Sequence, residues 1–355
     1  MRDLAPMARF GGLVASDLRD VTTDLGALDS SGFWAVAAGF EGRTVCARFG
    51  DVRRASAGPA AGPRWRGPDP GAWTSSMDRT AYERGVRTIR ERIATGEVYQ
   101  VNLCRVLGAP LPEQGPGGDA HDIDALTAAL AHGNPAPYAG TIRLPAHGVE
   151  IATASPELFL RRDGRTVESG PIKGTGRTAA DLLPKDHAEN VMIVDLVRND
   201  LGRVCATGTV TVPALCAVEA HPGLVHLVST VRGELRPDAG WPELFAAAFP
   251  PGSVTGAPKS SALRIIGELE TAPRGPYCGA IGWVDADRRT AELAVGIRTF
   301  WIDRTGPGPV LRFGTGAGIT WGSDPAGEWA ETRLKAARLL AVASEVHEAS
   351  GGMLR

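Results

Sequence analysis

Three features that mark particular protein classes are scarce in this 355-residue sequence. Lysine and arginine together (38) do not exceed aspartate and glutamate (40), so we expect no basic surface for nucleic acid. The apolar runs, such as residues 244–251, are far too short to span a membrane. The first twenty residues contain acids and no adequate apolar stretch, so they do not resemble a secretory signal. A soluble, cytoplasmic protein is expected.

Cysteine is also sparse, and its spacing excludes two kinds of site. The five cysteines are odd in number and no CxxC pair occurs, which argues against a disulfide framework and against a thiolate zinc site. The pattern suits a reducing compartment. The cysteines are Cys46, Cys104, Cys205, Cys216 and Cys278.

Hydrophobic residues make up 43% of the chain, enough for a sizeable core. Residues 1–73 predict a short β-rich segment followed by a linker rich in Pro, Gly and Ala, packed on a main domain at 74–348. Apolar residues at helical spacing predict a helix over 77–95, and alternation predicts a strand over 98–107. Strands and helices then follow no regular βα period, which favours an α+β fold with large antiparallel sheets.

Carboxylates recur at helical spacing in two predicted helices, 184–197 and 327–348. If both pairs faced one cleft, each close contact would cost roughly 4 kcal/mol at an effective dielectric near 20. A hard divalent cation would remove that cost, and oxygen ligands suit Mg²⁺. The alternative is two ordinary solvated helix faces, which spacing alone favours. The pairs are Asp186 with Glu189, and Glu328 with Glu331.

Two glycine-rich segments and one strand are candidates for binding anions. Residues 249–270 form a glycine loop that opens a helix, with Lys259 at a spacing that is not that of a Walker loop. Residues 312–320 run as a strand into alternating glycines and predict an amide-lined wall. Alternation over 290–300 places Arg298 beside two small residues, where it could dock a carboxylate or form a structural salt bridge. Simple turns explain the two loops equally well.

Lys173 lies in a tight apolar turn, ESGPIKGTGR. An ordinary lysine carries its charge at neutral pH, and only burial or a nearby cation would free the amine to act as a nucleophile. A surface lysine in a turn is the commoner case. His226 stands in a predicted strand, where a lone histidine is more often a hydrogen-bonded core residue than a catalyst.

Ten strings in one order carry a specific resemblance over residues 77–345: YQVNL, SPELFL, PIKGT, KDHAENVMIVDLVRNDLGRV, HLVST, GSVTGAPK, YCGAIGW, IRT, GAGI and ETRLKA. Together they resemble the chorismate-utilising enzymes. The resemblance implies an anthranilate synthase component I-like sandwich of large antiparallel sheets with outer helices. It also implies a Mg²⁺-dependent pocket for chorismate.

The resemblance also implies roles for individual residues. Those matching metal ligands are Glu189 and Glu331, with Glu328 beside them. Those matching substrate contacts are Arg298, Tyr277, Lys259, Thr175, Gln100, Gly316, Ala317 and Gly318. Those matching catalytic groups are Lys173, Glu157, His226 and Asp186, with either Glu157 or Asp186 as the general acid.

Two positions divide this family. Isochorismate and salicylate synthases carry a lysine that activates water where this chain has Gln100, which weighs against attack by water. Anthranilate synthases usually read PIAGT, whereas PIKGT is similar to aminodeoxychorismate synthase component I. In that chemistry the Lys173 amine attacks C2 of chorismate as the C4 hydroxyl leaves, and ammonia then attacks C4 and expels the lysine. The product, 4-amino-4-deoxychorismate, leads to 4-aminobenzoate and folate.

The resemblance implies a separate glutaminase subunit that supplies the ammonia, since the 77–345 core leaves no room for a fused one. The nearest alternative is anthranilate synthase component I. A catalytically silent chorismate-binding subunit is an alternative of another class. A Schiff-base enzyme that uses Lys173 is less favoured, because no pyridoxal phosphate cup is evident.

Overall fold

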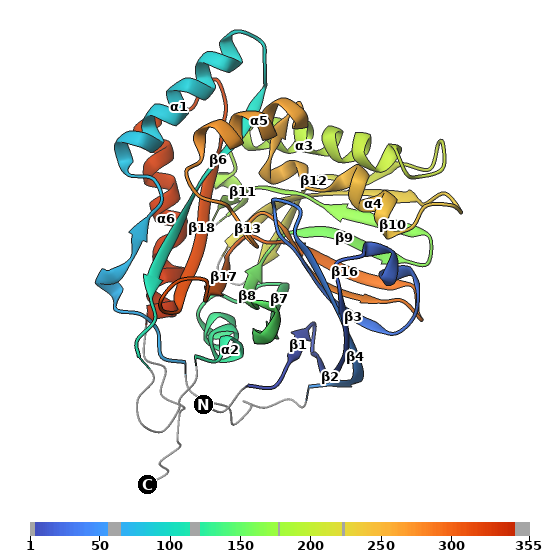
Figure 1. Cartoon of the computed structure of the whole chain (residues 1–355). Helices are drawn as coiled ribbons and strands as arrows, with labels where there is room; N and C mark the ends of the chain where they lie inside the picture. The colour runs from blue at the N-terminus through green and yellow to red at the C-terminus, as the bar shows by residue number, and fades with distance from the viewer. Residues whose placement is uncertain (1–3, 56–64, 114–120, 177, 222–223, 345–355) are drawn as a thin grey trace.

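A computed structural model describes residues 4–55, 65–113, 121–176, 178–221 and 224–344 (Figure 1). The α-helices are α1 (Arg79–Ala94), α2 (Ile123–Gly133), α3 (Pro184–Gly202), α4 (Trp241–Ala248), α5 (Lys259–Leu269) and α6 (Pro325–Ser344). Short 3₁₀ segments are η1 (Leu25–Asp29), η2 (Pro70–Ala72), η3 (Pro145–His147), η4 (Ala179–Asp181) and η5 (Gly252–Val254). No described helix is long and apolar enough to cross a membrane.

The strands in the first half of the chain are β1 (Met7–Phe10), β2 (Leu13–Thr22), β3 (Phe33–Ala38), β4 (Thr44–Arg54), β5 (Thr74–Ser75), β6 (Gln100–Pro110), β7 (Tyr138–Leu144), β8 (Val149–Ser155), β9 (Leu158–Asp163), β10 (Thr166–Gly170) and β11 (Ile172–Gly176). The later strands are β12 (Thr211–His221), β13 (Leu224–Glu234), β14 (Gly256–Ala257), β15 (Ala280–Asp285), β16 (Thr290–Val295), β17 (Thr299–Asp303) and β18 (Val310–Ile319).

These strands form one continuous, curled antiparallel sheet. Neighbouring strands pair in the order β6-β18-β17-β8-β7-β1-β2-β4-β3-β15-β16-β9-β10-β13-β12. Strands β5 and β14 also pair with β6, and β11 pairs with β13. Helices α1 and α6 pack beside β18 and β6, while α3 packs on β13 (Figure 1). The expected α+β fold with antiparallel sheets and outer helices is confirmed.

The helical pattern near residue 80 forms α1 as expected. Asp78 caps its first turn by accepting a hydrogen bond from the Ala81 N–H, and the apolar residues Tyr82, Val86 and Ile89 are fully buried. The helix therefore forms because one face covers the sheet.

Apolar residues at 191–194, 196 and 197 nearly encircle helix α3, a pattern that predicts a helix buried on all sides, but the structure leaves one side exposed. Ile193, Val197 and Leu201 face the sheet, but Val191 is 48% exposed. The helix thus lies on the surface of the sheet and not inside the core. Asp186 and Glu189 on this helix are half-buried.

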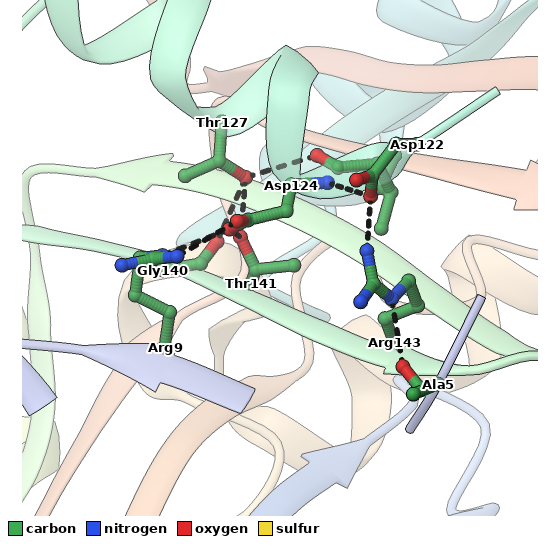
Figure 2. A network of polar contacts seen from close by, with 9 residues as sticks. Ala5, Arg9, Asp122, Asp124, Thr127, Gly140, Thr141 and Arg143 are labelled. Carbon is green, nitrogen blue, oxygen red and sulfur yellow. Dashed lines mark hydrogen bonds and ion pairs between the residues drawn. The ribbon is translucent and has the colours of Figure 1, made fainter. Parts of the chain in front are cut away.

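The N-terminal strands belong to the same sheet as the main domain, because β1 pairs with β7 and β3 pairs with β15. A polar network fixes this join (Figure 2). Arg9 of β1 donates two hydrogen bonds to Asp124 of α2, and Thr141 of β7 donates a third. Arg143 of β7 lies 2.5 Å from Asp122, the residue that caps α2. The network fastens α2 to β1 and β7.

Candidate active site

Lys173 lies on strand β11, paired with Leu227 of β13, and not in the tight turn expected from the sequence. The strand β11 carries it next to Gly174, whose φ of +71° favours glycine. A Cβ at Gly174 would also lie 2.9 Å from the Cβ of Asp186 on α3. The lysine side chain is only 16% exposed, and its Nζ lies 3.9 Å from Oε2 of Glu189. The amine therefore faces a carboxylate of α3 and not bulk solvent.

Glu157 is a second carboxyl group near this amine. It lies in the turn between β8 and β9, is 4% exposed, and accepts hydrogen bonds from the Ser253 side chain and the Ile172 N–H. Burial raises its pKa to about 7, although the Ser253 hydrogen bond and the charge of Lys173 oppose the rise. Near neutral pH such a carboxyl is partly protonated, so it can donate a proton.

The carboxylates of α6 face the same region. Burial works to raise the pKa of Glu331, but Lys335 at 2.6 Å, with the charges of Lys185 and Lys173, holds it below the usual range. Burial raises the pKa of Glu328, and the charge of Glu331 adds to that rise. The charges of Lys185 on α3 and Lys173 on β11 therefore act on the carboxylates of α6.

The donor chemistry of these carboxylates fits a hard divalent cation. Glu189 and Glu331 offer only oxygen atoms; Glu189 lies 3.9 Å from the Lys173 amine, and the charge of Lys173 also reaches Glu331. The repulsion that Glu331 exerts on Glu328 is of the kind that a cation relieves. Among the described residues, no three acidic, histidine or cysteine side chains already stand as a ready cluster. Water would have to complete the ligand set around a Mg²⁺ held by Glu189 and Glu331.

Gln100 of β6 and Gly318 of β18 lie next to the Lys173 amine. The Gln100 side chain is 1% exposed, and its Oε1 has no hydrogen-bond partner in the described structure. A Cβ at Gly318 would collide with the Gln100 amide and would lie 3.8 Å from Nζ of Lys173. The unpaired amide oxygen and the amine thus lie within a few ångströms of the same backbone position. A buried polar atom with no partner is costly unless a ligand satisfies it.

Gly316, Ala317 and Gly318 do not form a free loop, because they belong to β18 and pair with β6. On the other edge, β17 pairs with β18 only as far as Phe313. Amides beyond that point on this edge are not covered by β17, so a backbone wall for an anion remains compatible with the strand.

Arg298 corrects one expectation about local structure. The alternating strand ends at Val295, and Arg298 has a φ of 51°, so it does not share a strand face with Ala294. Its guanidinium forms no hydrogen bond or ion pair with any described residue, which excludes the structural salt bridge within that part of the chain. Burial lowers the pKa of this arginine. A half-buried guanidinium with no partner among the described residues is suited to an anionic ligand.

Four other residues of the predicted site have defined contacts of their own. Lys259 donates hydrogen bonds to Asp200 and to the Ala248 carbonyl. Asp186 accepts from the Leu183 N–H at the start of α3. The ring of Tyr277 covers Gly314, and its hydroxyl lies 3.9 Å from Sγ of Cys104. His226 is buried in β13, opposite Thr175 of β11. The Thr175 side chain lies outside the described part of the structure.

Two cavities in the described structure differ in their relation to this site. A cavity of about 20 Å³, room for one water molecule, adjoins Glu157 and is lined also by Ser253 and Asp200. A larger one, about 830 Å³, lies around Arg162 and Trp241 and includes none of the predicted site residues. The chemistry described above therefore does not depend on the larger cavity.

Sequence reasoning missed Ser253 and Lys185. It did predict Lys335 as the i+4 partner of Glu331 on an ordinary helix face, and this pair forms at 2.6 Å. A signal for the lysines was present in the composition, because only 4 of the 38 basic residues are lysine. Lys173, Lys185 and Lys335 all act electrostatically on the carboxylates of α6, and the fourth, Lys259, pairs with Asp200.

Comparison with known proteins agrees with this geometry. A family model described as chorismate binding enzyme matches residues 21–341. The chain therefore belongs to this family of chorismate-binding enzymes.

The chain is 41% identical to an aminodeoxychorismate synthase of Streptomyces pristinaespiralis, over 75% of this chain and 37% of that one. It is 38% identical to an anthranilate synthase component 1 of Haloarcula marismortui, over 78% of this chain and 56% of that one. The chain thus spans about half the length, or less, of these relatives. A solved isochorismate synthase of Bacillus anthracis has the same fold, with a TM-score of 0.76 at 24% identity and 95% coverage of both chains.

Proposed function

We propose that this chain is the chorismate-aminating subunit of an aminodeoxychorismate synthase. The observation that carries the proposal is the placement of Lys173. Its side chain is 16% exposed, its amine lies 3.9 Å from Glu189, and its charge acts on the pKa of the buried Glu157 carboxyl. Nucleophilic catalysis by lysine requires an amine that is withdrawn from bulk solvent, and this side chain is largely withdrawn. A cation held by the neighbouring glutamates would offset their attraction for the charged form of the amine. The relatives include both aminodeoxychorismate and anthranilate synthases, so this placement, with the PIKGT turn, supports the first assignment.

The proposed reaction balances with groups of this chain. The Lys173 amine forms a bond to C2, both ring double bonds shift toward C4, and the C4 hydroxyl leaves as water with a proton from Glu157. Ammonia then attacks C4, both double bonds shift back, and the bond between C2 and Lys173 breaks. The new ammonium returns one proton to Glu157, so both residues end as they began.

The remaining residues bind and orient the substrate in this proposal. The unpaired guanidinium of Arg298 binds a substrate carboxylate, and Oε1 of Gln100 accepts a hydrogen bond from the ligand. Glu189 and Glu331 would hold Mg²⁺, with Glu328 beside them. When bound, the ion neutralises these glutamates and a carboxylate of the substrate. A glutaminase subunit is the proposed source of ammonia.

The test is to incubate the purified chain with chorismate, Mg²⁺ and an ammonium salt, and to identify the product by mass and absorbance. We expect aminodeoxychorismate, no turnover after chelation of Mg²⁺, and no turnover with glutamine in place of ammonium. Lys173→Ala should lower kcat at least about a hundredfold, because the nucleophile is gone. When ammonia is withheld, the peptide containing Lys173 should gain the mass of chorismate less one water.

Other products would select other functions. Anthranilate and pyruvate would assign the chain to anthranilate synthase component I, and isochorismate would overturn the role given to Gln100. A folded protein that binds chorismate without turnover would be the silent subunit. Full turnover by the Lys173→Ala variant would remove the nucleophile from the mechanism.

A further inference from the structure

One fully buried side chain joins α3 to the sheet directly beside Glu189. Asn190 has no exposed surface, and its Nδ2 donates a hydrogen bond to the Leu227 carbonyl at 3.2 Å. Its Oδ1 accepts a short hydrogen bond from the Ser229 hydroxyl. Both partners lie on β13, so this residue fixes the height of α3 over that strand.

The same strand holds the segment that carries Lys173. Leu227 stands opposite Lys173 in the pairing of β13 with β11. The Ser229 N–H donates to the Pro171 carbonyl at 3.1 Å, two residues before Lys173. The Ser229 hydroxyl in turn accepts from the Cys216 N–H at 2.8 Å, which fixes its orientation. Ser229 is thus hydrogen-bonded both to Pro171, directly before the strand that bears Lys173, and to Asn190, on the helix that bears Glu189.

We infer that the hydrogen-bonded pair Asn190–Ser229 is a positioning clamp, which sets the Lys173 amine at its distance from the Glu189 carboxylate. Its consequence for catalysis rests on the function proposed above. A long lysine side chain can place its amine over several ångströms, and a misplacement of about 1 Å costs on the order of a hundredfold in rate. The clamp limits the positions open to the Lys173 amine and the Glu189 carboxylate, because it fixes the backbones of β11 and α3 relative to each other.

The clamp is separable from the docking of the helix. Ile193, Val197 and Leu201 bury the apolar face of α3 further along, and they remain when the clamp is removed. Loss of the clamp should therefore release the first turns of the helix, where Glu189 lies, without detaching the rest.

Ser229→Ala tests the clamp because it deletes one buried hydroxyl and leaves the backbone bond to Pro171 intact. Thr141→Val is the matched control. Its hydroxyl is equally buried and bonded, in the network around α2 that has no contact with Lys173 (Figure 2). Both variants should lower Tm by a similar few degrees.

Only Ser229→Ala should slow formation of the chorismate adduct on Lys173, at least tenfold, with KM for chorismate changed less than threefold. Equal adduct rates in the two variants would overturn the inference. Asn190→Ala removes both bonds to β13 and should lose more. If that variant does not fold, Ser229→Ala still decides the matter.

A readout without chorismate separates this inference from the proposed function. An amine-specific acylating reagent, followed by peptide mass spectrometry, reports on each of the four lysines. Lys173 should be acylated at least threefold faster in Ser229→Ala, since its side chain is no longer held inside, while Thr141→Val should match the unmodified chain. Unchanged acylation would defeat the clamp. Faster acylation in Ser229→Ala, with no chorismate adduct in the unmodified chain, would instead defeat the nucleophile role and leave the clamp standing.

Discussion

Glu157 shows how burial alone can make an ordinary side chain useful at neutral pH. A solvated glutamate is ionised above pH 5, but this one has lost its water, and its pKa rises to about 7. The hydrogen bond from Ser253 and the charge of Lys173 reduce the rise without abolishing it. The group can therefore give a proton to a leaving hydroxyl and take one back within a single cycle.

The first prediction concerns the pH dependence that Glu157 imposes. Because the acid form is needed, kcat should fall as pH rises through about 7. Glu157→Gln should be at least about a hundredfold slower below pH 7, and the difference should narrow as the pH rises. The measurement is kcat against pH from 5.5 to 9 for both proteins. A flat profile in the unmodified chain would exclude Glu157 as the general acid.

The same group should lower stability at alkaline pH. Its pKa is higher in the folded than in the unfolded chain, so its contribution is fully present below the unfolded value and is lost as pH rises through about 7. Glu157→Gln should therefore raise the free energy of unfolding by roughly 1–3 kcal/mol at pH 8 relative to the unmodified chain, and little at pH 5. Urea unfolding at the two pH values measures the difference. A gain equal at both would assign the effect to packing.

At the scale of elements, the site depends on glycines in strand β18, which let neighbouring groups come close to its backbone. The strand β18 has glycine at 314, 316 and 318. These positions leave room for the ring of Tyr277, for Sγ of Cys104 and for the amide of Gln100. Glycine is needed here for closeness of approach, since no positive φ is recorded at these three residues.

Gly318→Ala should therefore impair function more than folding. The added methyl group would displace the Gln100 amide and stand 3.8 Å from Nζ of Lys173. We expect kcat/KM for chorismate to fall at least tenfold, with a loss of stability of about 1–2 kcal/mol.

Gly108→Ala is the control for this prediction. It lies on β6 opposite Arg312, and its Cβ would meet Val310 no closer than 3.3 Å. It should retain nearly full kcat/KM. Equal losses in both variants would mean that the effect is a general weakening of the β6–β18 pair.

For the whole molecule, the curl of the sheet creates the site. The strands β6 and β18 stand at one end of the order of pairing, and β13 with β11 stands near the other. Yet Gly318 of the first end lies within contact distance of Lys173 at the second. The N-terminal strands β1 to β4 lie in the middle of this order, so they are part of the frame that brings the ends together (Figure 1).

Breaking the polar network around α2 should therefore lower the stability of the fold without changing catalysis. Asp122 accepts from Arg143 at 2.5 Å and also caps α2 through the Asp124 N–H. Asp122→Ala removes both contacts and should lower the free energy of unfolding by about 2–4 kcal/mol. Activity per folded molecule should be unchanged at a temperature where the variant is folded. Loss of activity in proportion to the unfolded fraction agrees with this view, whereas a lower kcat in fully folded protein contradicts it.

Local patterns predicted many elements well. The helix over 77–95 forms as Arg79–Ala94, and the pattern after Pro184 forms a helix that extends to Gly202. The strand over 290–300 was wrong at its end, because the chain turns at Arg298 with a φ of 51°, a conformation that alternation of side chains does not reveal. The view that α3 is surrounded by protein was also wrong, since apolar residues such as Val191 can remain on the surface.

The amino-acid sequence by itself determined the elements, the family and the chemical types at the site, because helical spacing, glycine positions and ordered motifs are local properties of the chain. It left open whether Lys173 is a solvated turn residue and whether the lysines at 173 and 185 act on the carboxylates of α6. Only the tertiary structure decided these points, since Gly318 and Glu331 are more than a hundred positions from Lys173 and approach it through the closure of the curled sheet. Burial in this fold raises the pKa of Glu157 and leaves the Lys173 amine facing Glu189.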